Sequence, residues 1–230
     1  MKKILIPLLI LTMMLTSCGT LNNLGIAPTS LETIQAVKGL MDGSSFRAIK
    51  ALQKMNAAGG IEGLLPKEIA PVLNTLKTLG VGKEVNDITK QINGISKMVA
   101  GESAGIMKDA IGSIKITDAV GVVLGAEDAA TMLLKNAMYG SVKKRYSERI
   151  DSELAKTEVP QYWPMATGAY NLFAKNKVDS DLSGFLAERA VDALFLTMGK
   201  EEKQIRQDPK KLQNAVVSKV FDYYQKKGGR

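Results

Sequence analysis

The stretch EDAATMLLKNAMYGSVKKRYSERIDSELAK, Glu127 to Lys156, contains no proline and carries apolar residues at every fourth position. Glu127 and Asp128 place two acidic side chains at its start, where the partial positive charge of a helix N-terminus favours them. The pattern predicts one long α-helix that runs to about Lys156. A stripe that recurs every four residues winds around a helix of 3.6 residues per turn, so this helix should contact different neighbours along its length.

Similar patterns occupy the rest of the chain from Thr29 onward. Thr29 and Glu32 form a possible capping box before a segment that we expect to be one helix, with an interruption near Gly39 and Gly43 as the alternative. The loop Ala57 to Gly63 ends that helix, and Gly80 ends the next one. The stretch from Lys83 to Ile114 is predicted to be two helical halves, with glycines at a break or at close helix contacts; these are Gly94, Gly101, Gly105 and Gly112.

The later segments are predicted from their start and stop signals. Thr117 and Asp118 should cap a short helix that ends at Gly125, and Glu158 to Pro164 (EVPQYWP) should break the helical run because it holds two prolines. We expect further helices from about Met165 to Lys175, after Asp179 and Asp181, and after Pro209. No alternating strand pattern is found, so the sequence predicts an all-α, single-domain bundle of about seven to ten helices over residues 29–227.

The N-terminal segment predicts export and lipid attachment. Met1-Lys2-Lys3 and the apolar run from Ile4 to Leu15 have the order of a secretory signal, and the run is too short to span a membrane comfortably. The following residues, LTSC, resemble a bacterial lipobox, in which the cysteine sulfur receives a diacylglycerol after cleavage of the signal. We therefore expect a signal peptide over residues 1–17, a lipid on Cys18, a tether over residues 18–28 and a short tail over 228–230. The alternative is an uncleaved helix with an accidental cysteine.

Composition limits the chemistry that the mature chain can perform. The chain has 230 residues, no histidine and one cysteine. Without Lys2 and Lys3, 29 basic residues face 23 acidic ones, which gives a net charge of +6. With Cys18 lipidated, no thiol remains, so disulfides, thiolate catalysis and thiolate metal sites are excluded. The absence of histidine removes the imidazole general base and the commonest zinc ligand. We expect no cofactor, no metal and no catalytic residue, and an export signal argues against nucleic acid as a partner.

Four ordered segments are similar to one bacterial lipoprotein family, which is known only as domain of unknown function four-one-nine-seven. They are LKTLGVGKEVNDITKQIN (Leu76 to Asn93), IKITDAVGVVLGAEDAAT (Ile114 to Thr131), LAERAVDALFLTMGKEEKQIRQDP (Leu186 to Pro209) and KVF (Lys219 to Phe221). The resemblance covers about Leu31 to Phe221 and implies an α-helical secreted domain, with no activity attached. Met132-Leu133-Leu134 stands where relatives often have an aromatic pair.

Several residues are candidates for a site. Thr117, Asp118, Glu127, Asp128 and Thr131 could hold a hard cation, although acidic residues at helix starts are also what capping favours. Glu201, Glu202 and Arg206 have the spacings of surface ion pairs, and a buried Glu202–Arg206 pair that lines a pocket is the functional alternative.

Two further features concern the cell envelope. Glu102 and Ser103 in GESAG resemble a fragment of lytic transglycosylases, which use one glutamate as acid and base; the other interpretation is an exposed acid at a helix break. Basic clusters could meet lipid phosphates, or they could be solvated faces; they are Lys143-Lys144-Arg145, Lys210-Lys211 and Lys226-Lys227-Arg230.

The sequence thus favours a non-catalytic envelope lipoprotein that binds a protein partner or a membrane surface. Gly19 after Cys18 hints at the periplasmic face of the outer membrane. The alternatives are a carrier or sensor of an apolar small molecule and, more remotely, a glutamate-dependent enzyme that cleaves the peptidoglycan glycan.

Overall fold

The structure, a computed structural model, describes residues 26–57, 69–78, 80 and 82–228. The described chain forms eight α-helices and one 3-10 helix, with no strand among these residues, so the predicted all-α multi-helix bundle is confirmed. The helices are α1 (Ser30–Ala57), α2 (Ile69–Thr78), α3 (Gly82–Ser113), α4 (Ala119–Leu124), α5 (Ala129–Leu154), α6 (Val159–Asn171), α7 (Leu182–Gln207), η3 (Pro209–Leu212) and α8 (Ala215–Gly228).

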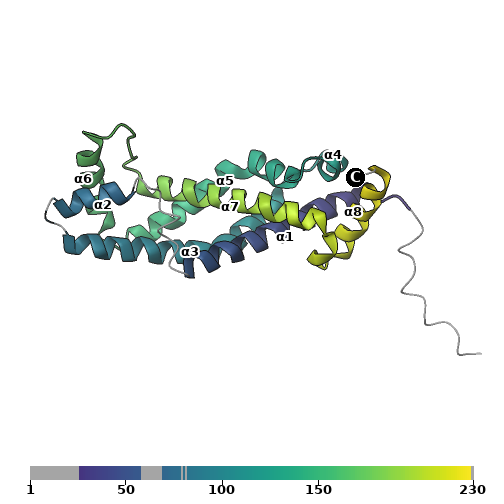
Figure 1. The fold of residues 1–230 in the computed structure, drawn as a ribbon, viewed down its shortest axis with the longest axis horizontal. Coiled ribbons are helices and arrows are strands. Elements are labelled where there is room, and N and C mark those ends of the chain that lie inside the picture. Colours follow the sequence, from purple (N-terminus) through teal and green to yellow (C-terminus); the bar gives the residue numbers. More distant parts are fainter. Residues whose placement is uncertain (1–25, 58–68, 79, 81, 229–230) are drawn as a thin grey trace, which may run out of the picture.

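Four long helices form the body of the molecule. α1, α3, α5 and α7 have 28, 32, 26 and 26 residues, which corresponds to about 40 to 50 Å each at 1.5 Å per residue. They run lengthwise side by side, and α1 packs on α3, α3 on α5, α5 on α7 and α7 back on α1 (Figure 1). Successive long helices run in opposite directions, so the body is an elongated up-down-up-down four-helix bundle.

Short helices close the two ends of this bundle. α2 and α6 pack on each other at one end, and α4, η3 and α8 pack at the end where the described chain begins (Figure 1). Ile26 and the C-terminal turn of α8 therefore lie at the same end of the molecule. The opposite end carries α6 and the connection from α6 to α7.

The capping signals are where the sequence predicts them. The Thr29 hydroxyl accepts a hydrogen bond from the Glu32 N–H at 3.1 Å, and Glu32 Oε2 accepts one from the Thr29 N–H at 2.8 Å, which confirms the capping box of α1. Asp118 and Asp181 accept hydrogen bonds from the N–H groups of Gly121 and Gly184 at the starts of α4 and α7. Gly80 has a φ of 86°, which suits its predicted place as a helix stop.

The predicted break of α3 is wrong, whereas α1 is one helix, as expected, and passes through Gly39 and Gly43. The absence of side chains at these two glycines lets Val217 and Leu212 of the C-terminal elements approach α1 closely. α3 is likewise one helix. A Cβ atom at Gly94, Gly101, Gly105 or Gly112 would meet nothing within 4 Å, so these glycines mark neither a break nor a close helix contact. The predicted loop from Ala57 to Gly63 lies largely outside the described residues.

The helical run does break at the segment EVPQYWP, over residues 155–158, but most of that segment is helical, and the helix expected from about Met165 to Lys175 covers Val159–Asn171 instead. α6 begins at Val159 and extends through Pro160, Trp163 and Pro164. Pro160 occupies the first turn, where a helix has no use for the missing backbone donor, and this position favours helix initiation. The Trp163 side chain is buried and its Nε1–H donates to the Asp179 carbonyl at 3.2 Å, which holds α6 against the segment before α7.

Candidate functional site

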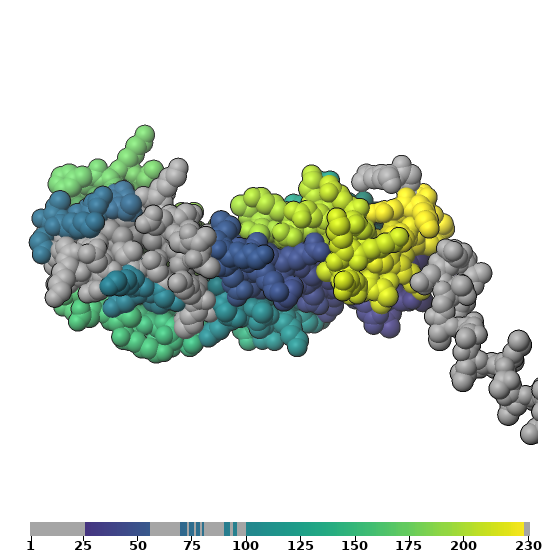
Figure 2. Space-filling model, turned by 60° about the horizontal axis from the view of Figure 1, so that its bottom comes forward, coloured from purple at the N-terminus to yellow at the C-terminus, as the bar shows by residue number. Residues whose placement is uncertain are grey.

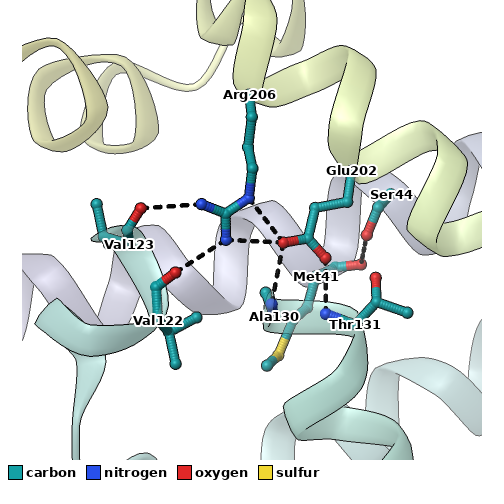
Figure 3. A network of polar contacts seen from close by, with 8 residues as sticks. All are labelled: Met41, Ser44, Val122, Val123, Ala130, Thr131, Glu202 and Arg206. Atoms are coloured by element: carbon teal, nitrogen blue, oxygen red, sulfur yellow. Dashed lines mark hydrogen bonds and ion pairs between the residues drawn. The ribbon is translucent and has the colours of Figure 1, made fainter. Parts of the chain in front are cut away.

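Glu202 is buried among the helices, near the end of the bundle that α4 closes, rather than exposed on a helix surface. It follows Met198 and precedes Ile205 on the buried face of α7, and its exposed fraction is 0%. No other charged residue in the described part of the chain is classed as buried. Its carboxylate accepts hydrogen bonds from the N–H groups of Ala130 at 3.0 Å and Thr131 at 2.6 Å, which are in the first turn of α5 (Figure 3).

Arg206, one turn further along α7, joins the same carboxylate to α4. Its Nε donates to Glu202 Oε1 at 2.9 Å, and Nη2 lies 2.8 Å from the same oxygen. Nη1 and Nη2 also donate to the carbonyl groups of Val123 and Val122, both at 2.9 Å (Figure 3). The guanidinium carbon lies 5.2 Å from the centre of the Phe221 ring of α8, a distance typical of a cation–π contact.

The pair therefore caps two helices from a third one. The last turn of α4 exposes carbonyl groups and the first turn of α5 exposes N–H groups, and both sets lack partners inside their own helices. The positive side chain meets the carbonyl end and the negative side chain meets the N–H end, as the helix dipoles favour. Both Glu202 oxygens already accept hydrogen bonds from the protein. This arrangement is suited to fixing the α4–α5 connection, not to holding a ligand.

The other candidates do not join this network. Thr117 is exposed, and the Asp118 carboxylate caps α4 by accepting from the Gly121 N–H at 2.7 Å. Glu201 points to α1 instead, where its Oε2 lies 3.9 Å from Nη1 of Arg47. Four of the candidate residues are thus divided among a cap (Asp118), an ion pair (Glu201) and the buried Glu202–Arg206 pair, while Thr117 is in none of them. The expectation of surface ion pairs holds for Glu201 in part and is wrong for Glu202.

The arrangement of the acidic residues near α4 and α5 does not favour the cation hypothesis. Glu127 forms an ion pair with Lys203 at 2.5 Å, and Asp118 is used as a cap. Asp128 stands at the start of α5 but makes no side-chain capping bond, since Glu202 binds the N–H groups there. Among the residues whose positions are described, no cluster of three acidic side chains is arranged to hold a metal ion.

An open groove of about 620 Å³ lies beside the buried pair, between α5 and α7. Its lining includes apolar and basic side chains, among them Met132, Leu196, Lys135 and Lys200. Thr131 lines it as well, and the buried hydroxyl oxygen of Thr131 has no hydrogen-bond partner among the described residues. A second groove, of about 680 Å³, lies where α5 ends and α6 and α7 begin. Both grooves are open to solvent, and Glu202 lines neither.

Glu102 occupies an exposed position on α3. Its carboxylate binds Arg149 of α5, with Nε 2.8 Å from Oε2, and it lines neither groove. The neighbouring Ser103 is buried and its Oγ accepts a hydrogen bond from the Tyr146 hydroxyl at 2.6 Å. Burial raises the pKa of Tyr146 to about 12, so this phenol stays protonated and acts as a link between α3 and α5.

The basic clusters differ in how far their charges are paired. In the central run, Lys143 pairs with Glu188 at 2.5 Å and Arg145 with Asp109 at 2.7 Å, while Lys144 lies 3.8 Å from Glu148. Lys226 makes no ion pair with any described residue, and Lys227 lies over the Tyr223 ring at 4.9 Å. Lys226 thus leaves an unpaired positive charge in the C-terminal turn of α8, at the end of the molecule where the described chain begins.

Sequence reasoning missed the tertiary cap and both grooves. One signal for the cap was available: Glu202 falls on the apolar stripe Val191, Leu194, Met198 and Ile205 of α7, where an acidic residue needs a buried partner. Its partners are backbone N–H groups of α5, which is distant in the sequence, so no pattern of side chains predicts them. The grooves depend on how α5, α6 and α7 pack and have no local sequence signal.

A comparison with protein families gives one match, to a model described as protein of unknown function (DUF4197), over residues 27–222. The match is to the same family as the resemblance drawn from the four sequence segments. No curated protein and no solved structure matches the chain.

Proposed function

We propose, from the premise that the chain belongs to the DUF4197 family of proteins of unknown function, that it is a non-catalytic lipoprotein of the bacterial cell envelope. Cys18 carries the lipid, and the helical body binds a membrane surface or a protein partner in the periplasm. The export signal, the lipobox order LTSC and the absence of histidine support this proposal. By the residue that follows Cys18, the anchor belongs in the outer membrane.

The observation that carries the proposal is the position of the basic end of the molecule. Ile26 is eight residues after Cys18, and eight residues span at most about 28 Å. At the end of the molecule where the described chain begins, the last turn of α8 carries Lys226 and Lys227, and Lys227 lies over the Tyr223 ring. A lipid on Cys18 would bring this turn close to lipid phosphates, where each basic residue contributes up to about 1 kcal/mol and a tyrosine ring suits the interface.

The body offers no observation that favours catalysis. Glu102 is engaged by Arg149, Glu202 by Arg206 and two backbone N–H groups, and the described helices include none that is long and apolar enough to cross a bilayer. A carrier of an apolar small molecule needs an enclosed cavity. Both grooves lined by described residues are open to solvent, and the core residues that the structure describes have exposed fractions of 8% or less.

Fluorescence quenching on the lipidated protein tests this proposal. If lipid occupies the Cys18 sulfur, a new cysteine is the only reactive thiol, so a fluorophore can be attached at Lys226→Cys or, as the matched control, at Lys144→Cys. Both variants lose one exposed lysine. In vesicles with headgroup-quencher lipids, the label at position 226 should be quenched more strongly than that at 144. Equal quenching, or stronger quenching at 144, would contradict the proposed orientation.

A further inference from the structure

The connection between α6 and α7 is a loop that the fold holds in place. The Asn171 side chain closes its base with two hydrogen bonds: Nδ2 donates to the Val178 carbonyl at 2.7 Å, and Oδ1 accepts from the Val178 N–H at 2.8 Å. Val178 itself is buried in the core, and Phe173 and Ala174 donate their N–H groups to the Tyr170 carbonyl. The chain from Leu172 to Lys177 is therefore a short loop with a fixed base.

This loop presents large apolar side chains to solvent. Leu172 is 77% exposed and Phe173 is 92% exposed, more than any other large apolar residue in the described chain. Met165, 47% exposed, lies seven residues before Leu172 and so on the same face of α6. Apolar side chains that stay in water contribute no burial energy to the stability of the fold. Exposed apolar groups gathered in this way are typical of an interaction surface.

The charges on the loop point to an anionic partner. Lys175 and Lys177 are exposed and make no ion pair within the described residues. The next acidic residues along the chain are Asp179 and Asp181, and their carboxylates accept hydrogen bonds from the N–H groups of Asp181 and Gly184. Two free ammonium groups thus stand within a few residues of two exposed apolar side chains.

The loop lies at the end of the bundle opposite the one where the described chain begins (Figure 1). In Figure 2 the light-green segment between α6 and α7 projects from that end of the molecule. A protein partner would need a pocket shaped for this projection, with acidic groups beside it. A bilayer with anionic lipids accepts apolar side chains at its acyl boundary and supplies phosphates at the depth of the lysines.

We propose that the loop Leu172–Lys177, together with Met165, is a membrane-insertion surface for anionic lipids, separate from the Cys18 anchor. Leu172 and Phe173 enter the boundary between headgroups and acyl chains, and Lys175 and Lys177 bind the lipid phosphates. Burial of one such apolar side chain should strengthen lipid binding by about 10-fold or more. Because the anchor is not involved, the loop can be tested on a chain without it.

The test uses residues 19–230, a chain that retains every contact described above and whose helicity is first checked by circular dichroism. Binding is measured by flotation with vesicles that contain phosphatidylglycerol and with vesicles of phosphatidylcholine alone. The variants are Phe173→Ser and the double substitution Lys175→Gln/Lys177→Gln. Leu196→Ser is the matched control, since Leu196 is also an exposed apolar residue, 63% exposed, but lies on α7.

The chain should bind the anionic vesicles, Phe173→Ser should weaken binding by about 10-fold or more, and Leu196→Ser should leave it unchanged. The lysine variant should bind more weakly and with a smaller dependence on salt. A fluorophore at Asn176→Cys should shift to a more apolar environment in these vesicles. Absence of vesicle binding, or equal losses for Phe173→Ser and Leu196→Ser, would overturn the proposal.

The same variants separate a protein partner from a membrane. If the chain does not bind vesicles and Phe173→Ser abolishes a crosslink to an envelope protein, the loop binds a protein and the membrane proposal is wrong. None of these outcomes depends on the lipid at Cys18, so failure here leaves the proposed anchoring standing.

Discussion

Substitution of Glu202 by glutamine should destabilise the fold through the loss of a two-helix cap. In the structure Oε1 accepts from the Ala130 N–H and from Arg206, and Oε2 accepts from the Thr131 N–H. A glutamine must place its NH₂ group against at least one of these donors. It also removes the charge that compensates Arg206, whose side chain is 10% exposed.

Breaking a buried ion pair by removing one partner typically costs about 3–5 kcal/mol. Glutamine keeps the shape and one acceptor, so we expect a loss near the lower limit, about 3 kcal/mol. For a domain of this size, 1 kcal/mol shifts the melting temperature by about 2–4 °C, which gives an expected decrease of about 6–12 °C. The assay is urea and thermal unfolding of residues 19–230, followed by far-ultraviolet circular dichroism.

Glu201→Gln is the matched control. Its carboxylate is partly exposed and 3.9 Å from Arg47, so its removal should cost less than about 1 kcal/mol. The double variant Glu202→Met/Arg206→Met should lose less stability than the two single substitutions together, because neither charge is left buried alone. If Glu202→Gln is no more destabilising than Glu201→Gln, the carboxylate does not cap α5 and the reasoning fails.

Three further outcomes are expected. Hydrogen bonds from the Lys219 ammonium and the Thr29 N–H lower the pKa of Glu32 from 4.5 to about 2, so the ionised carboxylate stabilises the fold above pH 4.5. The free energy of unfolding, measured by acid titration, should therefore fall between pH 4.5 and about 2, and it should fall less in Glu32→Gln. Gly43→Val should lower the denaturant midpoint by an amount equivalent to about 1–3 kcal/mol, because its side chain would overlap Leu212, whereas Gly105→Ala, which meets nothing, should raise it slightly. Tyr146→Phe should cost about 0.5–1.5 kcal/mol in the same assay, because it removes the hydrogen bond from the Tyr146 hydroxyl to Ser103 that links α5 to α3.

Local signals predict the helices of this protein well. The Thr29–Glu32 box and the caps Asp118 and Asp181 depend on residues three positions apart, and a sequence contains that information directly. The glycines are less informative. A side chain at Gly43 would overlap Leu212, which is distant in the sequence, whereas a Cβ atom at the α3 glycines meets nothing. The sequence around each glycine does not show which of them lies at a close contact.

The prolines of α6 show a related limit. A proline ends a helix when it falls in the interior and favours helix initiation when it falls in the first turn. Pro160 falls in the first turn of α6. The candidate site likewise depends on contacts between residues that are distant in the sequence. The sequence shows that Glu202 and Arg206 are spaced to form a pair, but the pair is buried because the C-terminus of α4 and the N-terminus of α5 both pack against it, and only the tertiary fold creates this packing.

The attachment of lipid to Cys18 is the central claim of this account, and the mass of the N-terminal peptide tests it most directly. The protein is extracted from the membranes of the bacterium that makes it, digested, and its N-terminal peptide is measured by mass spectrometry. If Cys18 is the lipid attachment point, the peptide begins at Cys18 and carries the mass of a diacylglycerol and an acyl chain. An unmodified peptide that continues from Ser17 into Cys18 would contradict it.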